Sequence, residues 1–279
     1  MTSHDAVAFV RRVLKEKRVG HTGTLDPAAA GVLPICVGAA TRLVEELQAG
    51  TKRYIAEATF GQETDSGDLL GATVREADAA GLSVDDVRAV LNDFRGVITQ
   101  TPPLHSAIKV GGVKLYELAR AGKEIDIPTR QVTISRLELA RWNASVPSAL
   151  LDIECSGGTY IRSLIRDIGR DIDCAATMSF LVRERSGLFS VADAISPEEF
   201  ERAPQLIPVR TILEQLTAEI ITDDALALAL WQGKRVQLTP TFPDDTRPIA
   251  VENEAQTLFA LASRVEGGGW KADKVFDLR

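Results

Sequence analysis

The chain has 279 residues, of which 45% are hydrophobic and 25% charged, and its formal net charge is −7 at pH 7. These values are ordinary for a globular protein, and the length suits one large domain with a small one. No apolar run approaches the roughly 20 residues that a membrane span needs, and residues 1–12 lack a signal-peptide pattern. We therefore expect a cytoplasmic protein with no membrane partner.

Cysteine and histidine usage argues against a metal site. The three cysteines, Cys36, Cys155 and Cys174, are widely spaced and form no CxxC pair, so we expect them to be reduced and buried. The three histidines are scattered and lack the spacing of metal ligands. The sequence therefore predicts no metal.

The acidic total hides two local concentrations of positive charge. Between Arg11 and Arg18, five basic residues surround a single acidic one, and a second cluster contains Lys109, Lys114 and Arg120. Local patches decide phosphate binding, because the net charge averages over the whole surface. A basic face is therefore a hypothesis, and its simpler alternative is a solvated helix face.

The first predicted element is an amphipathic helix over residues 2–17, in which Thr2 opens a capping-box pattern. A glycine-bounded loop follows over residues 20–31. Residues 32–37 are apolar enough for a buried strand, and residues 54–60 alternate in part, which predicts a second strand.

Ser83 then caps another predicted helix. Pro102 lies in a Thr-Pro-Pro stretch that cannot continue a helix or a central strand, so a loop begins there. Residues 132–139 and 150–155 are predicted strands. Between residues 157 and 169 the apolar period becomes helical.

Ser196 starts one more helix. From about Thr217 onward the sequence predicts short strands separated by Gly, Pro and Asp. These strands are residues 234–238, 249–252, 258–265 and 274–278. The order of elements predicts an α+β body followed by a compact β-rich region.

The most informative stretch is GHTGTLDPAAAGVLP, residues 20–34, which sets Asp26 in a glycine-bounded loop. The structural interpretation is a helix cap, because Asp26-Pro27 is a good helix start and residues 28–30 would continue a short helix. The functional interpretation is a catalytic carboxylate. Spacing alone favours the cap, so the rest of the sequence must decide.

A second stretch, SGGTYIRSLIRDIG at residues 156–169, places Arg162 in the first turn of a helix. A cation gains nothing from the helix dipole there, so this arginine needs a carboxylate or phosphate partner. Taken alone, this turn slightly favours an arginine in a surface salt bridge over one in a functional site.

Taken together, four stretches closely resemble the TruB family of tRNA pseudouridine synthases. They are GHTGTLDPAAAGVLP, KRYIAEATFGQETDSGD, TPPLHSAIKVGGVKLYELARAG and SGGTYIRSLIRDIG, with LVRERSG at residues 181–187 as a weaker fifth. They span about residues 20–187 in the family's order and at its usual spacing. The resemblance implies a pseudouridine synthase fold over residues 1–215, with a central mixed or antiparallel sheet and flanking helices. It also implies, more loosely, a PUA-like RNA-binding domain over residues 216–279.

The resemblance implies that the chain isomerises the T-loop uridine at position 55 of tRNA to pseudouridine, without cofactor or metal. Asp26 would be the catalytic aspartate, and Arg162 would pair with it and keep it ionised. Tyr54 would stack on the flipped base, and Tyr160 would line the pocket. His21 would fill the space that the extruded bases leave.

Residues 101–123 resemble the family's thumb, which clamps the RNA and would bring Lys109, Lys114 and Arg120 to it. The implied partner is the T-arm of tRNA. We expect a monomer that needs no obligate protein partner.

The chemistry agrees with these roles. Isomerisation breaks the C1′–N1 bond, turns the uracil and joins C1′ to C5, and positive character at C1′ calls for an adjacent carboxylate. That carboxylate can add covalently to the sugar or base, or take the C2′ proton, and the sequence does not choose. Tyrosines and apolar walls suit the exclusion of water.

Two features depart from the family pattern. Its members usually begin with an apolar strand and a Lys-Pro turn that have no counterpart before Thr2, so we expect an exposed strand edge or core face. His105 stands in the thumb where the family usually has tyrosine, which predicts a modest change in RNA grip.

Two other functions compete with this one. A non-catalytic tRNA-binding or tRNA-folding module would keep the basic patches and need neither Asp26 nor Arg162. A guide-RNA-dependent synthase of the dyskerin type shares the catalytic motifs, but it usually carries a longer basic tail.

Overall fold

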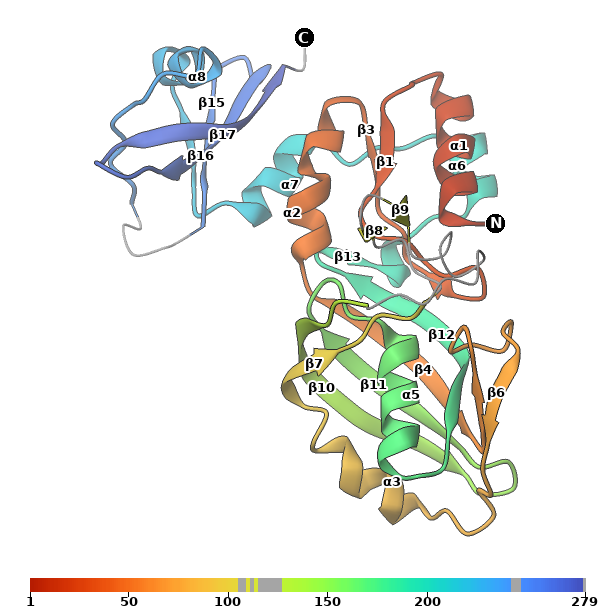
Figure 1. Ribbon diagram of the computed structural model, residues 1–279. Helices are drawn as coiled ribbons and strands as arrows, with labels where there is room; N and C mark the ends of the chain where they lie inside the picture. Colours follow the sequence, from red (N-terminus) through yellow and green to blue (C-terminus); the bar gives the residue numbers. More distant parts are fainter. Residues whose placement is uncertain (105–108, 111–112, 115–126, 242–246, 278–279) are drawn as a thin grey trace. The chain divides into compact units, whose positions relative to one another are not determined.

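The structure is a computed structural model that describes residues 1–104, 109–110, 113–114, 127–241 and 247–277 (Figure 1). The chain divides into two compact units. The first unit comprises Met1–Ser3, Gly23–Pro34 and Glu46–Ala194, and the second comprises His4–Thr22, Ile35–Glu45 and Ile195–Arg279. The division does not test the predicted boundary at residue 216.

A seven-stranded mixed sheet forms the first unit. Its main path runs in the order β13-β12-β4-β11-β10-β7 with antiparallel neighbours, and β2 adds to β12 in parallel. The strands are β2 (Ala30–Gly31), β4 (Lys52–Phe60), β7 (Gly96–Gln100), β10 (Arg130–Asn143), β11 (Ser148–Cys155), β12 (Ala176–Ser186) and β13 (Phe189–Ser190). In β4, buried and half-buried residues alternate strictly, which confirms the strand predicted over residues 54–60.

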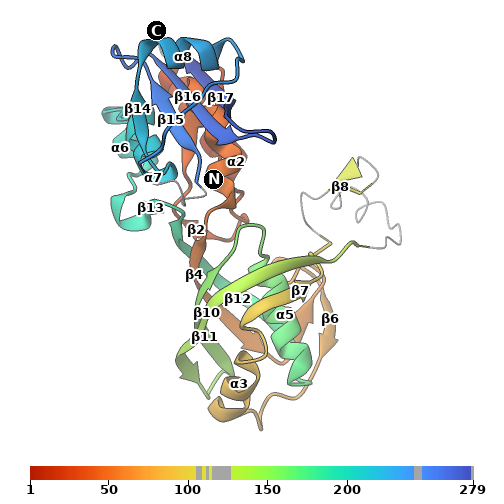
Figure 2. The ribbon, with the colours of Figure 1, turned by 90° about the vertical axis from the view of Figure 1, so that its left-hand side faces the viewer.

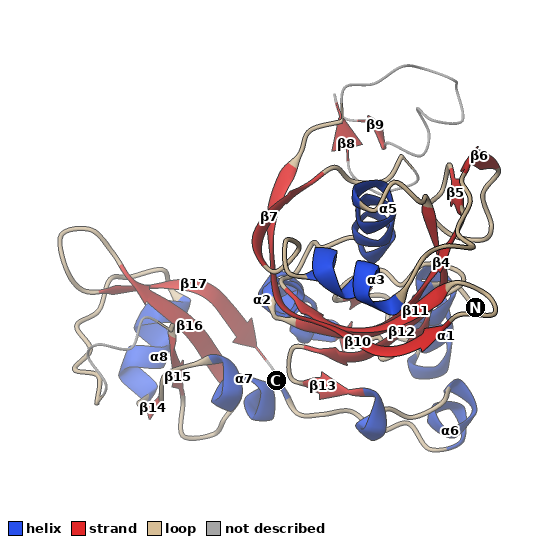
Figure 3. Ribbon diagram, turned by 90° about the horizontal axis from the view of Figure 1, so that it is seen from below, coloured by secondary structure: helices blue, strands red, loops and turns tan. Residues whose placement is uncertain are grey.

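Helix α5 (Ile161–Asp171) packs on the sheet because one of its faces is apolar. Ile161, Leu164, Ile165 and Ile168 are all buried in the main core. Figure 3 shows the sheet curving around α5 and around α3 (Val84–Leu91). The remaining elements of this unit are β5 (Gln62–Thr64), β6 (Thr73–Glu76), β8 (Lys109–Val110), β9 (Val113–Lys114) and the 3₁₀ helix η2 (Val191–Asp193).

Among the residues that the structure describes, two hydrophobic clusters lie in the second unit. In one, Val7 and Val10 of α1 pack with Val19 and Phe200. The other joins α8 to a four-stranded sheet in the order β14-β15-β16-β17 (Figure 2). The elements are α1 (Ser3–Leu14), β1 (Val19–His21), β3 (Ile35–Val37), η1 (Gly38–Leu43), α6 (Pro197–Arg202), α7 (Val209–Leu216), β14 (Ile220–Thr222), α8 (Asp224–Trp231), β15 (Ile249–Glu252), β16 (Leu258–Arg264) and β17 (Trp270–Asp277), while α2 (Val44–Ala49) begins in this unit and ends in the first.

Two N-terminal predictions are wrong in detail, and the helix-cap interpretation of Asp26 also differs from the structure. The first helix ends at Leu14, short of residue 17, because Lys15 takes a φ of 54°. The strand predicted over residues 32–37 shrinks to β3, which begins directly after Pro34. No helix follows Asp26, where a turn leads into β2 instead.

The β-rich C-terminal region is confirmed, although β14 was not among the predicted strands, and two further corrections apply. Residues 234–238 contribute only an isolated bridge between Val236 and Trp270. Helix α8 was not predicted, because its sequence, DALALALW, alternates in a way that hides the helical period.

The fold class is confirmed as a mixed α/β body with C-terminal strands. All three cysteines are free and buried, as predicted. Within the described residues, none of the helices combines the length and apolar character needed to cross a membrane.

Candidate active site

Asp26 lies in a loop whose conformation is fixed by backbone contacts. The amide of Ala29 donates to the carbonyl of Asp26 at 2.9 Å, which closes a turn, and Ala30 and Gly31 then join β12 as β2. At the start of the loop, the Ser3 hydroxyl donates to the Leu25 carbonyl and accepts from the Leu25 amide. The Asp26 side chain remains 28% exposed, so one side of the carboxylate is open.

Arg162 binds this carboxylate with a two-pronged interaction. Its Nε lies 2.7 Å from Asp26 Oδ2 and its Nη2 lies 3.0 Å from Oδ1, while Nη1 donates to the Ser66 carbonyl at 2.7 Å. The Arg162 side chain is only 5% exposed, which strengthens these charge-assisted bonds. Asp68 approaches the same guanidinium at 3.9 Å. The fork therefore fixes the orientation of the Asp26 carboxylate.

Tyr54 lies on β4, directly opposite Arg183 of β12. Burial raises the pKa of Tyr54 to about 12, and the charge of Asp26 adds a small part of this increase. The phenol therefore stays protonated at neutral pH, and Tyr54 offers a neutral aromatic ring rather than a base.

Tyr160 precedes the first turn of α5 and is held by a residue that the sequence reasoning missed. The buried side chain of Gln100 accepts from the Tyr160 amide at 2.8 Å and donates to the Tyr160 carbonyl at 3.0 Å. The Arg130 guanidinium lies 5.5 Å from the centre of the Tyr160 ring. Ser163 and Arg166 both donate to the carbonyl of Thr101, which secures the first residue of the predicted thumb.

The remaining predicted residues lie in the second unit, in the β8–β9 hairpin or outside the described residues. His21 ends β1 in the second unit, opposite Ile35. The backbones of Lys109 and Lys114 pair with each other in the β8–β9 hairpin. Arg120 and His105 lie outside the described residues.

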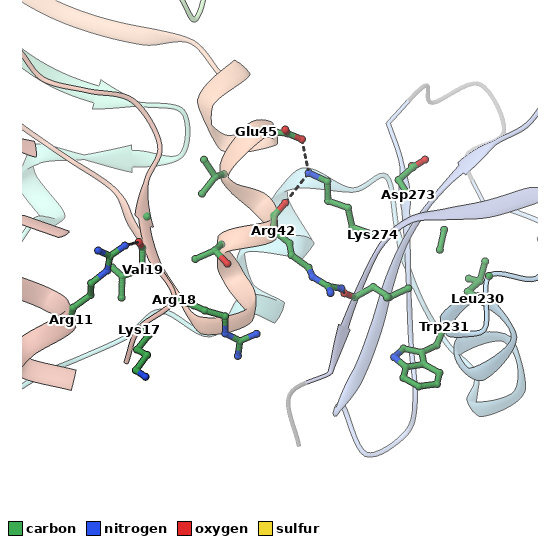
Figure 4. Close-up of a pocket in the computed structure, with 16 residues that line it drawn as sticks. Arg11, Lys17, Arg18, Val19, Arg42, Glu45, Leu230, Trp231, Asp273 and Lys274 are labelled. Atoms are coloured by element: carbon green, nitrogen blue, oxygen red, sulfur yellow. Dashed lines mark hydrogen bonds and ion pairs between the residues drawn. The ribbon is translucent and has the colours of Figure 1, made fainter. Parts of the chain in front are cut away.

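The second unit contains an open cleft of about 870 Å³ (Figure 4). Its charged lining is mostly basic, and Lys274 donates to the Glu45 carboxylate at 3.1 Å and to the Arg42 carbonyl at 2.7 Å. The basic lining residues are Arg11, Lys17, Arg18, Arg42 and Lys274, and the acidic ones are Glu45 and Asp273. Trp231 also lines the cleft.

In the part of the chain that the structure describes, no three His, Cys, Asp or Glu side chains gather as they would around a metal ion.

Residues 11–161, more than half of the chain, match the family described as "TruB family pseudouridylate synthase (N terminal domain)". The chain belongs to the TruB family. The matched range includes the Asp26 loop and Tyr54 and ends one residue before Arg162.

Full-length relatives agree with this assignment. A tRNA pseudouridine synthase B from Heliobacterium modesticaldum is 47% identical over 84% of this chain and 77% of its own length. One from Listeria monocytogenes is 39% identical over 100% of this chain and 95% of its own length.

A crystal structure of a Cbf5-Nop10-Gar1 complex superposes with a TM-score of 0.68 at 24% identity, covering 99% of this chain and 82% of that chain. Because the identity is low, this likeness shows a similar fold and nothing more. The likeness in fold covers the C-terminal strands as well as the sheet.

The sequence reasoning missed three residues that shape the site. Gln100 holds Tyr160, Asp68 approaches Arg162, and Arg183 binds the Asp26 loop. Arg183 lies within the quoted LVRERSG stretch, but its partners are about 150 residues away in sequence. Only the pairing of β2 with β12 brings them together.

Proposed function

We propose that this chain isomerises a T-loop uridine of tRNA, at position 55, to pseudouridine, with Asp26 as the catalytic carboxylate. The observation that carries the proposal is the bidentate Asp26–Arg162 pair, in which a buried arginine holds a partly exposed carboxylate. The names of the relatives, tRNA pseudouridine synthase B, support the substrate and the reaction. Such a pair is unnecessary in a protein that only binds RNA.

The reaction needs a carboxylate that is ionised and correctly aimed. When the C1′–N1 bond breaks, its electron pair stays on the uracil and positive character grows at C1′, where a nearby carboxylate stabilises it. Asp26 can do so by covalent addition or by taking the C2′ proton, since both routes start from the charged form. After C1′ joins C5, the hydrogen on C5 leaves as a proton and the aromatic ring is restored.

Tyr54 and Tyr160 would provide the walls of the pocket. Extruding a base costs a few kcal/mol, and stacking on an aromatic ring recovers about 1–3 kcal/mol per base. A protonated, largely buried Tyr54 fits this role, because it offers a neutral face beside Asp26. Apolar walls also keep out water, which would otherwise capture C1′ and release free uracil.

We propose that the basic cleft of the second unit contributes to holding tRNA. Three of its cations, Arg11, Lys17 and Arg18, come from the basic segment that the sequence singled out. Removing one phosphate contact makes the plot of log affinity against log salt concentration less steep, by about one unit of slope. Lys17→Ala and Arg18→Ala should each show this change with the uridine conversion rate at saturation preserved. An unchanged slope in both variants would place the RNA elsewhere.

The finer assignments follow from the same proposal. Residues 1–215 would form the catalytic domain, with a thumb over 101–123, and residues 216–279 a PUA-like RNA-binding domain. The protein would act as a cytoplasmic monomer on the T-arm of tRNA, without an obligate protein partner.

The deciding experiment uses an unmodified tRNA transcript carrying tritium at uridine C5, because formation of the new bond expels that label. Wild type should release tritium and Asp26→Asn should not. Asp152→Asn is the matched control, since Asp152 also binds arginine side chains, those of Arg53 and Arg136. Asp152 pairs with Ile55 in the sheet, so it projects from the face opposite to that of Tyr54. Tight tRNA binding with no release by wild type would favour the non-catalytic binding module. Release only in the presence of a copurified RNA would favour a guide-dependent enzyme.

A further inference from the structure

Arg183 is the largest fully buried side chain in the described part of the protein, with 1% of its surface exposed. It lies on β12, opposite Tyr54 of β4 on one side and Gly31 of β2 on the other. Directly opposed residues in a sheet project to the same face, so Arg183 and Tyr54 are neighbours beside the Asp26 loop.

The guanidinium of Arg183 contacts both ends of that loop. Nη2 donates to the Gly23 carbonyl at 3.2 Å and Nη1 approaches the Thr24 carbonyl at 3.5 Å, while Nε donates to the Val32 carbonyl at 2.9 Å. The backbone adds a further bond from the Val32 amide to the Arg183 carbonyl at 2.9 Å. One side chain thus closes residues 23–32 into a loop of fixed span.

The charge of Arg183 is balanced in an unusual way. Among the ion pairs between described residues, none includes Arg183. Backbone carbonyl dipoles therefore stabilise its positive charge, where a carboxylate usually does so. Burying an arginine this way is a poor means of gaining stability, because a well-packed apolar side chain serves at least as well. What the planar guanidinium offers is a rigid fork that can reach several carbonyls at once.

We propose that Arg183 is a positioning residue that clips the two ends of the Asp26 loop together and thereby sets the carboxylate against Arg162 and the substrate. The inference rests on the proposed function for its effect on rate, but the clip itself is a property of the loop. Arg183 acts through the backbone of residues 23–32.

The test replaces Arg183 with methionine, which keeps much of the volume, and with lysine, which keeps the charge and loses the fork. Arg183→Met should slow single-turnover tritium release about 100-fold, the usual cost of a small misplacement of a catalytic group. Its affinity for tRNA should match that of wild type. The rate of tritium release by Arg183→Lys should lie between those of wild type and Arg183→Met, because one ammonium cannot hold both ends of the loop.

Arg95→Met is the matched control, since the Arg95 guanidinium also grips a backbone carbonyl, that of Leu137, far from the loop in sequence. Amide hydrogen exchange gives a readout that does not depend on turnover. Exchange should rise in the peptide covering residues 23–32 of both Arg183 variants and stay unchanged there in Arg95→Met.

A second perturbation keeps Arg183 and disturbs the same contact. Gly31 has a φ of 114°, and a Cβ on it would overlap the backbone carbonyl of Arg183. Gly31→Ala should therefore free the loop and slow the reaction without removing a charge, even if Arg183→Met does not fold.

Two results would overturn the clip. The first is unchanged exchange in residues 23–32 of folded Arg183→Lys and Gly31→Ala. The second is a rate that falls only as much as the folded fraction does. If wild type itself released no tritium, the proposed function would fail, and the exchange measurement would still decide the clip.

Discussion

Replacing Arg162 with lysine separates the charge of this residue from its geometry. Lysine keeps a cation near Asp26, but a single ammonium cannot reproduce the bonds of 2.7 and 3.0 Å that hold both carboxylate oxygens. One charge-assisted hydrogen bond contributes about 1.5–3 kcal/mol. If that energy serves orientation, the rate of tritium release should fall about 10- to 150-fold.

Partial exposure of Asp26 decides where in that range the result should lie. Water can reach a carboxylate that is 28% exposed and replace part of the lost bond, so we expect the lower part of the range. The assay is single-turnover tritium release with enzyme in excess, together with tRNA affinity measured separately. Affinity should change little, because Arg162 is 5% exposed and serves the carboxylate.

Arg170→Lys is the control, because Arg170 lies two turns further along α5 and pairs with Glu63. It should keep the wild-type rate. A wild-type rate in Arg162→Lys would refute the argument that orientation matters. Equal losses in both variants would show that α5 is merely destabilised.

Three further predictions concern Lys52, Gly169 and two buried thiols. Burial lowers the pKa of Lys52 from 10.5 to about 8, so the unfolded chain binds more protons than the folded chain between these pH values. The stability of wild type relative to Lys52→Met, measured by urea unfolding, should therefore rise as the pH rises from about 8 to about 10. Gly169→Ala should lower the free energy of unfolding by about 1–3 kcal/mol, because the new Cβ would lie 2.5 Å from the Cβ of Ala176. The control is Gly81→Ala, since a Cβ on Gly81 meets no atom within 4 Å. A loss of stability no larger than in that control would contradict the prediction. Burial raises the thiol pKa of Cys36 and Cys155 to about 11, so Ellman's reagent at pH 8 should react with them only after unfolding, and rapid reaction in the native state would refute their burial.

Local sequence signals predicted the elements that depend on local contacts. Ser83 and Ser196 form capping boxes with the residue three positions on, and both helices begin where those caps place them. The alternation in residues 54–60 predicted most of β4. Helix α8 was not predicted because the alternation of its sequence, DALALALW, hides the helical period, although Asp223 caps its start.

The candidate site depends on contacts that no local pattern can show. The Asp26-Pro27 pair is a sound helix start in isolation, yet the carboxylate is taken by an arginine 136 residues away. The family resemblance pointed to that partnership, and the bond distances place the two side chains together. Gln100 and Arg183 gave no comparable signal, since each matters through the backbone atoms it binds.

The packing of α1 has a consequence for how the protein is made. Phe9 and Phe200 are aromatic neighbours, with ring centres 6.5 Å apart, and Val7 and Val10 share the same cluster. A ribosome adding about 5–20 residues per second needs roughly 10–40 s to reach Phe200 after it has finished α1. During that interval the apolar face of the first helix lacks its final partner. The apolar face of the N-terminal helix therefore has to avoid aggregation until nearly three quarters of the protein has been synthesised.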